Sequence, residues 1–348
     1  MVDGRGVIGP PRDERELEDR LSTPSPQDIE AARRLDGDVL VLGAGGKMGP
    51  TLTRLVQRAC AEARVPWRVI AVSRYRAHGV RDGLEAAGVH TVACDLLDPA
   101  ALAELPDAPN VILLAGQKFG TAADPESTWA LNAFLPGLLG QRYRRARTVV
   151  FSTGNVYPLA DVATRGSRET DPVGPQGEYA QSALARERIA TFFARRYDTP
   201  LAILRFNYAV ELRYGVLHDL VARVAAGAPI DLTMGYVNVL WQRDANSVAL
   251  RSLDACQIPP LVLNVTGAER LAVRQVAETI GLRLGRSPTF VGTEAPTALL
   301  SDAGCCWERF GAPAVDAATV LEWAIAWHGQ GGPSLGKPTR FEERGGEF

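Results

Sequence analysis

The sequence predicts an α/β fold, a doubly wound parallel sheet of the Rossmann type with a smaller C-terminal substrate-binding lobe. Short apolar runs alternate with segments of helical spacing up to about residue 206, and this alternation is typical of parallel strands covered by helices on both faces. A glycine-rich turn joins the first apolar run to the first long helical segment, which is where nucleotide-binding α/β folds carry one.

The same patterns give the individual elements. We expect strands at residues 38–42, 68–72, 90–93, 111–115, 148–151, 201–206 and 262–265. We expect helices at residues 51–64, 80–87, 99–105, 127–144, 179–196, 217–226, 271–284 and 317–327. The serine and proline residues between positions 22 and 26 provide capping and first-turn chemistry for a short helix that runs to Arg34.

These elements divide the chain into consecutive parts. Residues 1–36 form an N-terminal extension, of which residues 1–22 are polar and expected to be loosely held before the short helix. Residues 37–208 with 237–266 form the nucleotide-binding domain, and residues 209–236 with 267–328 form the substrate-binding lobe. Residues 329–348 are rich in glycine, proline and charge, and we expect them to form a surface tail.

Composition excludes several classes of protein. The 348 residues carry a net charge of −2, so there is no electrostatic case for a nucleic-acid or membrane partner. No apolar segment is long enough to cross a bilayer, and the charged N-terminus does not resemble a signal peptide, so we expect a cytoplasmic protein. Five scattered cysteines predict reduced thiols, and four distant histidines predict no metal site.

The glycine-rich turn at residues 43–49 is the strongest functional signal. Glycine allows the chain to turn tightly off a strand, lets the backbone approach a pyrophosphate, and lets the helix pack close to the sheet. The following helix then offers free N–H groups and partial positive charge to the phosphates. A turn without a ligand is the alternative, which the strand–turn–helix context disfavours. The cofactor-binding residues predicted here are Gly43, Gly45, Gly46, Lys47, Met48 and Gly49.

The end of the second strand indicates which dinucleotide binds. An acidic residue there would bind the ribose 2′-hydroxyl of NAD, whereas a basic residue accommodates the 2′-phosphate of NADP. The strand runs into Ser73 and Arg74 with no carboxylate, and Lys47 lies in the nearby turn. Both cations suit a phosphate dianion, so NADP is favoured and NAD stays possible. The alternative is that Arg74 is a solvated surface charge.

The GxxGxxG spacing of this turn resembles that of the extended short-chain dehydrogenase/reductase family, which contains sugar-nucleotide epimerases and dehydratases. The resemblance runs from about residue 38 to residue 327. It implies that Asp95 and Leu96 lie at the adenine of the cofactor. It also implies that Ala115 and Gly116, after the fourth strand, pass beneath the cofactor.

The resemblance also assigns the reacting groups. Asn132 matches the family's structural and catalytic Asn, and Thr153 matches its catalytic Ser/Thr. Tyr179 stands where the family places its catalytic Tyr. Thr153, Asn155 and Asn207 are expected to contact the substrate. Members commonly form dimers through helices that correspond to residues 127–144 and 179–196, so the resemblance implies a homodimer.

Three departures weaken the transfer of function from the family. The family motif is YxxxK, but Ala183 replaces the Lys that would hold the nicotinamide ribose and lower the pKa of Tyr179. A Tyr of ordinary pKa about 10 is scarcely ionised at neutral pH, so base-driven oxidation suffers more than reduction. Lys118 is the first candidate to replace the missing cation, and the alternative for it is a plain phosphate or substrate contact. Arg186, two helical turns after Tyr179, is the second.

The other departures concern the substrate. Gly154 and Asn155 replace the acidic pair that serves water elimination in the family's dehydratases, so dehydration is disfavoured. No arginine stands near Val237 or Asn238, where the family contacts a nucleotide diphosphate. We therefore expect an NAD(P)-dependent epimerase or dehydrogenase/reductase that acts on a hydroxyl or keto group of a sugar-like or other polar small molecule. The alternative is a catalytically impaired NAD(P)-binding sensor or scaffold of the same fold.

Overall fold

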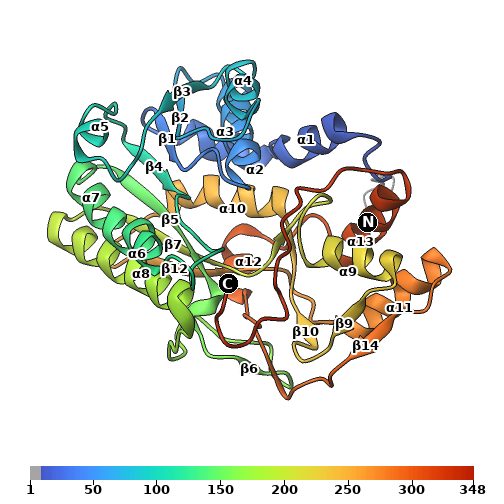
Figure 1. Ribbon diagram of the computed structural model, residues 1–348. Helices are drawn as coiled ribbons and strands as arrows, with labels where there is room; N and C mark the ends of the chain where they lie inside the picture. The colour runs from blue at the N-terminus through green and yellow to red at the C-terminus, as the bar shows by residue number, and fades with distance from the viewer. Residues whose placement is uncertain (1–8) are drawn as a thin grey trace.

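A seven-stranded parallel sheet forms the centre of the computed structural model, which describes residues 9–348 (Figure 1). Its order is β12-β7-β5-β4-β1-β2-β3, so the chain starts in the middle and winds outward to each edge in turn. This doubly wound arrangement confirms the predicted fold class. The strands are β1 (Val39–Leu42), β2 (Val69–Ser73), β3 (His90–Ala93), β4 (Asn110–Leu113), β5 (Arg147–Thr153), β7 (Leu201–Phe206) and β12 (Leu261–Val265).

The register of the sheet brings several strand ends together. Leu42, the last residue of β1, pairs with Val72 of β2 and with Leu113 of β4. Thr153 at the end of β5 pairs with Phe206 at the end of β7. Because parallel strands end at one edge of a sheet, the segments that follow β1, β4, β5 and β7 meet at that edge. The strand order reverses between β1 and β4, which is where doubly wound sheets bind ligands.

Helices cover both faces of this sheet. One face packs against helices that share a core with β1 and β7, namely α2 (Pro26–Arg33), α3 (Gly49–Ala63), α4 (Val80–Glu85), α10 (Gln242–Ala255) and α12 (Gly304–Phe310). The other face packs against α5 (Pro99–Ala103), α7 (Leu135–Arg142) and α8 (Gly177–Tyr197), and α6 (Pro125–Trp129) lies against α8. Both layers are apparent in Figure 1.

Several of these helices differ from expectation, and α12 was not predicted. The helix expected over residues 127–144 is divided into α6, a π-helical turn η1 (Ala130–Phe134) and α7. Pro136 lies in the first turn of α7 and has no N–H to continue a regular ladder, which explains a change of hydrogen-bond register just before it. Helix α10 was not predicted, because buried polar residues such as Gln242 and Asn246 hide its apolar period.

The remaining elements build a lobe around a second apolar core. This core joins α9, α11 and α13 through Leu220, Ile280 and Trp327, all nearly fully buried. The lobe is completed by four short strand pairs, β8–β11, β9–β14, β10–β13 and β6–β15. The elements are η2 (Gly154–Val156), β6 (Ala160–Asp161), β8 (Ala209–Val210), α9 (Val216–Ala226), β9 (Pro229–Asp231), β10 (Tyr236–Val237), β11 (Leu240–Trp241), β13 (Leu271–Ala272), α11 (Val273–Leu284), β14 (Thr289–Val291), β15 (Thr297–Ala298) and α13 (Ala317–Gly329).

The N-terminal extension is ordered from Asp13 onward. Helix α1 (Glu14–Ser22) begins with an Asp13 side-chain cap and buries Leu17 and Leu21 completely in the second core. The expectation of a loosely held segment is therefore wrong for this stretch. The predicted helix that follows is confirmed as α2, with Ser25 as its cap. Residues 1–8 of that expectation lie outside the described residues.

The C-terminal segment is held against the molecule at points that the sequence did not single out. Figure 1 shows it running from α13 across the molecule and ending near α6 and α8. Thr339, Phe341 and Phe348 are buried, with relative exposures of 2%, 1% and 6%. The rest of the segment is exposed or half-buried, so the description as a surface tail stays a prediction, to which these three buried side chains add anchoring points. None of the helices of residues 9–348 has the length and apolar character needed to cross a membrane.

Candidate functional site

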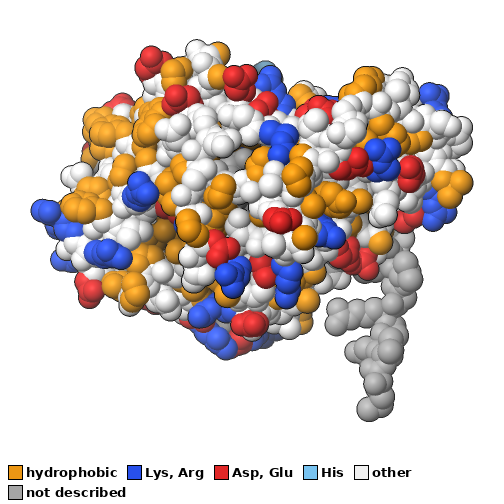
Figure 2. Space-filling view, turned by 90° about the horizontal axis from the view of Figure 1, so that it is seen from below, with side chains coloured by type: hydrophobic (Ala, Val, Ile, Leu, Met, Phe, Trp, Pro, Cys, Tyr) orange, Lys and Arg blue, Asp and Glu red, His pale blue; other side chains and the backbone are white. Residues whose placement is uncertain are grey.

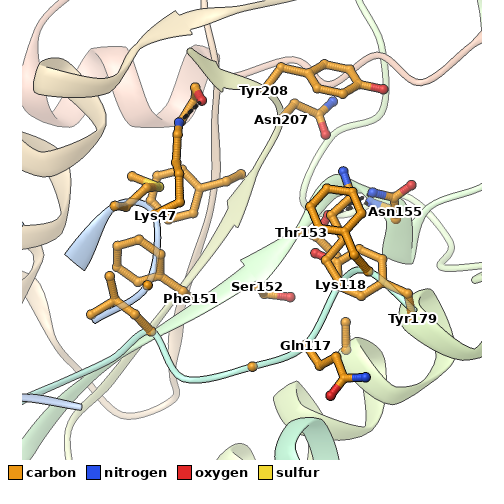
Figure 3. Close-up of a pocket in the computed structure, with 18 of the residues that line it drawn as sticks. Lys47, Gln117, Lys118, Phe151, Ser152, Thr153, Asn155, Tyr179, Asn207 and Tyr208 are labelled. Carbon is orange, nitrogen blue, oxygen red and sulfur yellow. Dashed lines mark hydrogen bonds between the residues drawn. The ribbon is translucent and has the colours of Figure 1, made fainter. Parts of the chain in front are cut away.

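A cavity of about 310 Å³ opens at the edge of the sheet where the strands end. Its walls come from the glycine turn, the segment after β4, the end of β5, helix α8 and the segment after β7. Figure 3 shows the polar residues Thr153, Asn155 and Tyr179 grouped with Lys118 on one side, and Lys47 on the other. The topology thus brings together most of the residues that the sequence assigned to one site. Some predicted cofactor residues do not line this cavity, namely Gly45, Ser73, Arg74, Asp95, Leu96 and Ala115.

The glycine turn has a backbone that no larger residue could replace. Gly43 has φ +94°, and a Cβ there would lie 2.5 Å from the backbone nitrogen of Ala115. A Cβ on Gly45 would lie 2.5 Å from Ser73 Oγ, and one on Gly49 would lie 2.3 Å from the carbonyl oxygen of Ala44. The glycines are therefore required by close packing between β1, β2, β4 and α3.

The turn also offers free hydrogen-bond donors. Within the described residues, the backbone amides of Lys47 and Met48 donate to no protein group, whereas those of Gly46 and Gly49 close the turn itself. Free amides at the start of a 15-residue helix form an anion-binding cradle. The residues present therefore fit the paired phosphates of a dinucleotide.

The two cations expected at the ribose 2′-position contact different neighbours. Arg74 Nη1 lies 3.8 Å from Asp95 Oδ2, and both side chains are largely exposed. Lys47 Nζ instead donates to the carbonyl oxygen of Ala209 at 2.7 Å and lies 4.6 Å from the centre of the Tyr214 ring. This corrects the expectation that Lys47 and Arg74 face the same phosphate. Burial lowers the pKa of Lys47 to about 7.

Other predicted cofactor residues lie along the same edge. Ser73 Oγ lies beside Gly45, and Ala115 packs against Gly43. Asp95 follows β3 and accepts a hydrogen bond from the amide of Leu97, while Leu96 is buried beside it. These residues follow the ends of β2, β3 and β4, and their contact with the cofactor stays a prediction.

Thr153, Asn155 and Tyr179 form the polar side of the cavity. Thr153 Oγ1 accepts hydrogen bonds from the Asn155 backbone nitrogen at 3.2 Å and from Asn155 Nδ2 at 3.0 Å. Its own hydroxyl hydrogen therefore remains for donation, to Tyr179 or to a bound ligand. Burial raises the pKa of Tyr179, while a hydrogen bond with Thr153 and the positive charge of Arg186 act in the opposite direction. Tyr179 is consequently a neutral proton donor at pH 7.

Asn132 and Arg186 form a buried floor beneath these residues. Arg186 Nη2 donates to Asn132 Oδ1 at 2.6 Å, and its Nη1 donates to the carbonyl oxygen of Phe151 at 2.8 Å. Asn132 Nδ2 donates to the carbonyl oxygen of Gln117 and to Ser182 Oγ. A Cβ on Gly116 would lie 2.2 Å from Arg186 Nη2, so this glycine makes room for the guanidinium. Asn132 is thus a positioning residue that ties the segment after β4 to α8.

A cation near the position of the missing lysine comes from a neighbouring turn of α8, where Arg186 lies. Ala183 is buried, and Arg186 lies on the same helix face as Tyr179 and Ala183 because residues spaced three and four apart on a helix are neighbours. The positive charge of Arg186 lowers the pKa of Tyr179, which makes Arg186 a candidate for the cation that acts on this hydroxyl. The sequence favoured Lys118 for this role, and the signal for Arg186 was its helical spacing.

Lys118 lies on the outer side of the cavity among aromatic rings. Its Nζ is 5.4 Å from the ring centre of Phe119, 6.0 Å from that of Tyr179 and 5.9 Å from that of Tyr208. Burial lowers the pKa of Lys118 to about 8. The sequence did not single out either Phe119 or Tyr208, since isolated aromatic residues carry no motif.

The C-terminal segment contributes a wall that the sequence also missed. The Phe348 ring packs edge-on against Tyr179 with 5.5 Å between centres, and Lys118 Nζ lies 4.8 Å from the Phe348 ring centre. Thr339 lines the cavity and donates to Asp219 Oδ2. Large apolar residues in a polar tail were the signal available for this contact.

Asn207 has an unused acceptor at the inner end of the cavity. Its Nδ2 donates to Ser301 Oγ at 3.0 Å, while its Oδ1 is buried without a partner among the described residues. A Cβ on Gly154 would lie 2.0 Å from that oxygen, so Gly154 keeps the amide accessible. Val237 and Asn238, where the family carries an arginine, are buried and carry no charge.

The profile of the NAD dependent epimerase/dehydratase family matches residues 39–235, which is more than half of the chain. The chain therefore belongs to this family, and the predicted resemblance is confirmed. No curated protein matches the chain by sequence.

Solved structures of this fold are similar over most of the chain. UDP-glucose 4-epimerase from Thermotoga maritima is 16% identical, with 84% of this chain and 99% of that chain covered and a TM-score of 0.69. UDP-glucose 4-epimerase from Thermus thermophilus in complex with NAD is 19% identical, with 83% and 98% covered and a TM-score of 0.68. UDP-glucuronic acid 4-epimerase from Bacillus cereus, with UDP-glucuronic acid and NAD, is 16% identical, with 84% and 99% covered and a TM-score of 0.70. At these identities the likeness shows the fold.

Proposed function

We propose that this protein is an NAD(P)-dependent epimerase or dehydrogenase/reductase acting on a hydroxyl or keto group of a sugar-like or other polar small molecule. The observation that supports this proposal is the pairing of Thr153 with Tyr179 in the cavity that also contains the glycine turn. Proteins of similar fold bind UDP-glucuronic acid and NAD in the complexes named above. Such ligands agree with a reaction at a hydroxyl or keto group of a polar substrate.

Each residue then has a defined task. Thr153 donates a hydrogen bond to the reacting oxygen, because Asn155 fixes its hydroxyl as an acceptor and leaves the hydrogen free. Tyr179 gives a proton to that oxygen in reduction and removes it in oxidation. A bound cofactor would supply a nicotinamide ring that can accept a hydride and give it back. Arg186 stabilises developing negative charge on Tyr179 from below.

The direction of the pKa shift favours reduction at neutral pH. Since burial raises the pKa of Tyr179, the hydroxyl is protonated below its folded pKa and is ready to donate. Oxidation needs the phenolate, so its rate should rise with pH in the alkaline range. Loss of the Arg186 charge would move that rise to still higher pH.

The preference for NADP is a finer proposal. It rests on Arg74, which has no acidic residue beside it on β2 and faces solvent near Ser73. Asp95 lies close to Arg74 and offsets part of its charge. Substitution of Arg74 by Ser should therefore weaken NADPH binding more than NADH binding, and equal effects on both would refute this preference.

A homodimer through α8 and the helices of residues 127–144 (α6, η1 and α7) is part of the proposal. Trp129, Phe134 and Phe192, on α6, η1 and α8, have relative exposures of 38%, 57% and 56%. Figure 2 shows apolar side chains gathered on the side of the molecule where these helices lie in Figure 1. Large exposed apolar residues in one region are typical of protein interfaces. Sedimentation of the wild type and of Phe192→Glu measures the expected loss of the dimer.

The central test separates binding from chemistry. NADH and NADPH are titrated into the full chain by cofactor fluorescence, and turnover is measured with a panel of sugars, uronates, ketoses and UDP-sugars. Tyr179→Phe should keep cofactor affinity and lose turnover, whereas Tyr197→Phe, the same change at the far end of α8, should keep both. Absence of binding for both dinucleotides would overturn the proposal.

One observation favours a sensor or scaffold as the second candidate. In the family that the sequence resembles, the motif carries a lysine at the position of Ala183. The usual activation of Tyr179 is therefore missing. Cofactor binding with no turnover on the whole panel, together with an Ala183→Lys variant that gains turnover, would select this candidate.

A further inference from the structure

The charges that line the cavity are unbalanced. Its walls in the described structure include Lys47, Lys118 and Arg186, but no aspartate or glutamate. A cavity with only positive side chains attracts anions, because charges in partly desolvated clefts are weakly screened. The two negative charges of a dinucleotide's pyrophosphate would leave part of this positive charge unmatched.

Two of the three cations already have fixed protein partners. Lys47 donates to the carbonyl oxygen of Ala209, beside the glycine turn. Arg186 donates to Asn132 and to the carbonyl oxygen of Phe151, beneath Tyr179. Both therefore lie on the inner side of the cavity, where the cofactor is proposed to bind.

Lys118 is the exception. Within the described residues it has no hydrogen-bond acceptor and no ion-pair partner, and its contacts are four aromatic rings. Ring faces attract an ammonium but accept none of its three strong hydrogen bonds. Asp219, the nearest acid to affect it electrostatically, is already bonded to Thr339. The ammonium thus presents unused donors to the cavity.

The C-terminal segment limits what can reach Lys118. Phe348 is held by hydrogen bonds from the amide and hydroxyl of Thr121 to its backbone oxygen. Arg344 anchors the segment through the carbonyl oxygens of Thr233 and Thr297, at 2.9 and 2.7 Å. The ring of Phe348 packs against Tyr179, so that four aromatic rings surround the Lys118 ammonium beside the reacting hydroxyl.

We propose that the substrate carries a carboxylate, and that the Lys118 ammonium binds it among the rings of Phe119, Tyr179, Tyr208 and Phe348. This inference rests on the proposed function for the place of the reacting group. A single carboxylate supplies one negative charge and two acceptor oxygens, which match the one unpartnered ammonium. The depressed pKa of Lys118 agrees, since an ammonium held in apolar surroundings gains most from an arriving anion.

The test compares three sugars that differ at one position. D-Glucuronate, D-glucose and D-glucose 6-phosphate are each titrated, by saturation-transfer NMR, into the full chain saturated with NADH at pH 7. The variants are Lys118→Met, which removes the charge, and Lys118→Arg, which keeps it. Lys337→Met is the matched control, because Lys337 is an exposed lysine of the C-terminal segment.

We expect wild type to bind glucuronate at least about tenfold more tightly than glucose, as one charge-assisted contact gives. The preference should disappear in Lys118→Met, return in Lys118→Arg and persist in Lys337→Met. Equal affinities in wild type, or a preference that survives Lys118→Met, would overturn the inference. Tighter binding of glucose 6-phosphate would overturn the carboxylate assignment. NADH fluorescence in the same samples reports separately on cofactor binding, so failure of the proposed function is seen independently.

Discussion

Replacement of Lys118 by methionine is expected to stabilise the fold at neutral pH while it removes a functional charge. The pKa of Lys118 falls from 10.5 to about 8 because the ammonium is desolvated. That difference corresponds to about 3.4 kcal/mol between the charged and neutral forms. Because the side chain is only half-buried and keeps some solvent contact, we expect a gain of about 2 kcal/mol in the free energy of unfolding.

The pH dependence fixes the sign of this effect. Below pH 8 the lysine is protonated in both the folded and the unfolded chain, so the folded state carries the full cost. Between pH 8 and 10.5 the folded state loses its proton first, the unfolded state binds more protons, and stability rises with pH. Methionine abolishes this rise. The variant should therefore exceed wild type at pH 7 and approach it near pH 10.

The assay is urea denaturation of wild type, Lys118→Met and Lys337→Met at pH 7 and pH 10. The contribution of Lys47 cancels between wild type and Lys337→Met, whereas Lys118→Met also removes the repulsion that Lys118 exerts on Lys47, which acts in the same stabilising direction. Equal stabilities at pH 7 with equal slopes against pH would refute the reasoning, because they would mean that water solvates the Lys118 ammonium fully. Reductive ¹³C-methylation gives an independent check, since Lys47, Lys118 and Lys337 are the lysines of the chain and their titrations can be followed by NMR.

Three further predictions follow from the packing. Gly43→Ala should destabilise the fold by about 1–3 kcal/mol and weaken NADH binding in fluorescence titrations, because of its φ of +94° and its contact with Ala115; Gly329→Ala, in open space, should change neither, and equal NADH affinities would contradict this view of the turn. Phe348→Ala should raise the acrylamide quenching of bound NADH several-fold, and unchanged quenching would mean that the C-terminal segment does not cover the cofactor side of the cavity. Leu17→Ala should lower the free energy of unfolding by about 2–4 kcal/mol in urea, whereas a change below 0.5 kcal/mol, as expected of a surface site, would show that α1 is not part of the core.

The fold class and the cofactor turn could be predicted from sequence because both depend on local patterns. Strand β7 begins and ends at the predicted residues, and α9 differs by one residue at its start. Apolar runs and helical periods are set by which faces each segment buries, so they are present in the sequence itself. The glycine turn is equally local, since the backbone requires glycine at Gly43 whatever surrounds it.

The charge network of the site could not be predicted in this way. Lys118 and Arg186 were both named from the sequence, but their tasks depend on which oxygens lie within reach. Asn132 and Phe151, far away in the chain, occupy the hydrogen bonds of Arg186, and nothing occupies those of Lys118 among the described residues. Such pairings arise only when separate strands end at the same edge of the sheet.

By itself, then, the sequence determined the parallel sheet, the glycine turn and the identity of the hydroxyl pair Thr153 and Tyr179. Tertiary structure alone decided that α1 buries Leu17 and Leu21, that Arg186 acts on Tyr179, and that Phe348 packs against Tyr179 beside Lys118. The physical reason is range: periodicity and backbone conformation act over a few residues, whereas burial and the pairing of charges are settled between segments hundreds of residues apart.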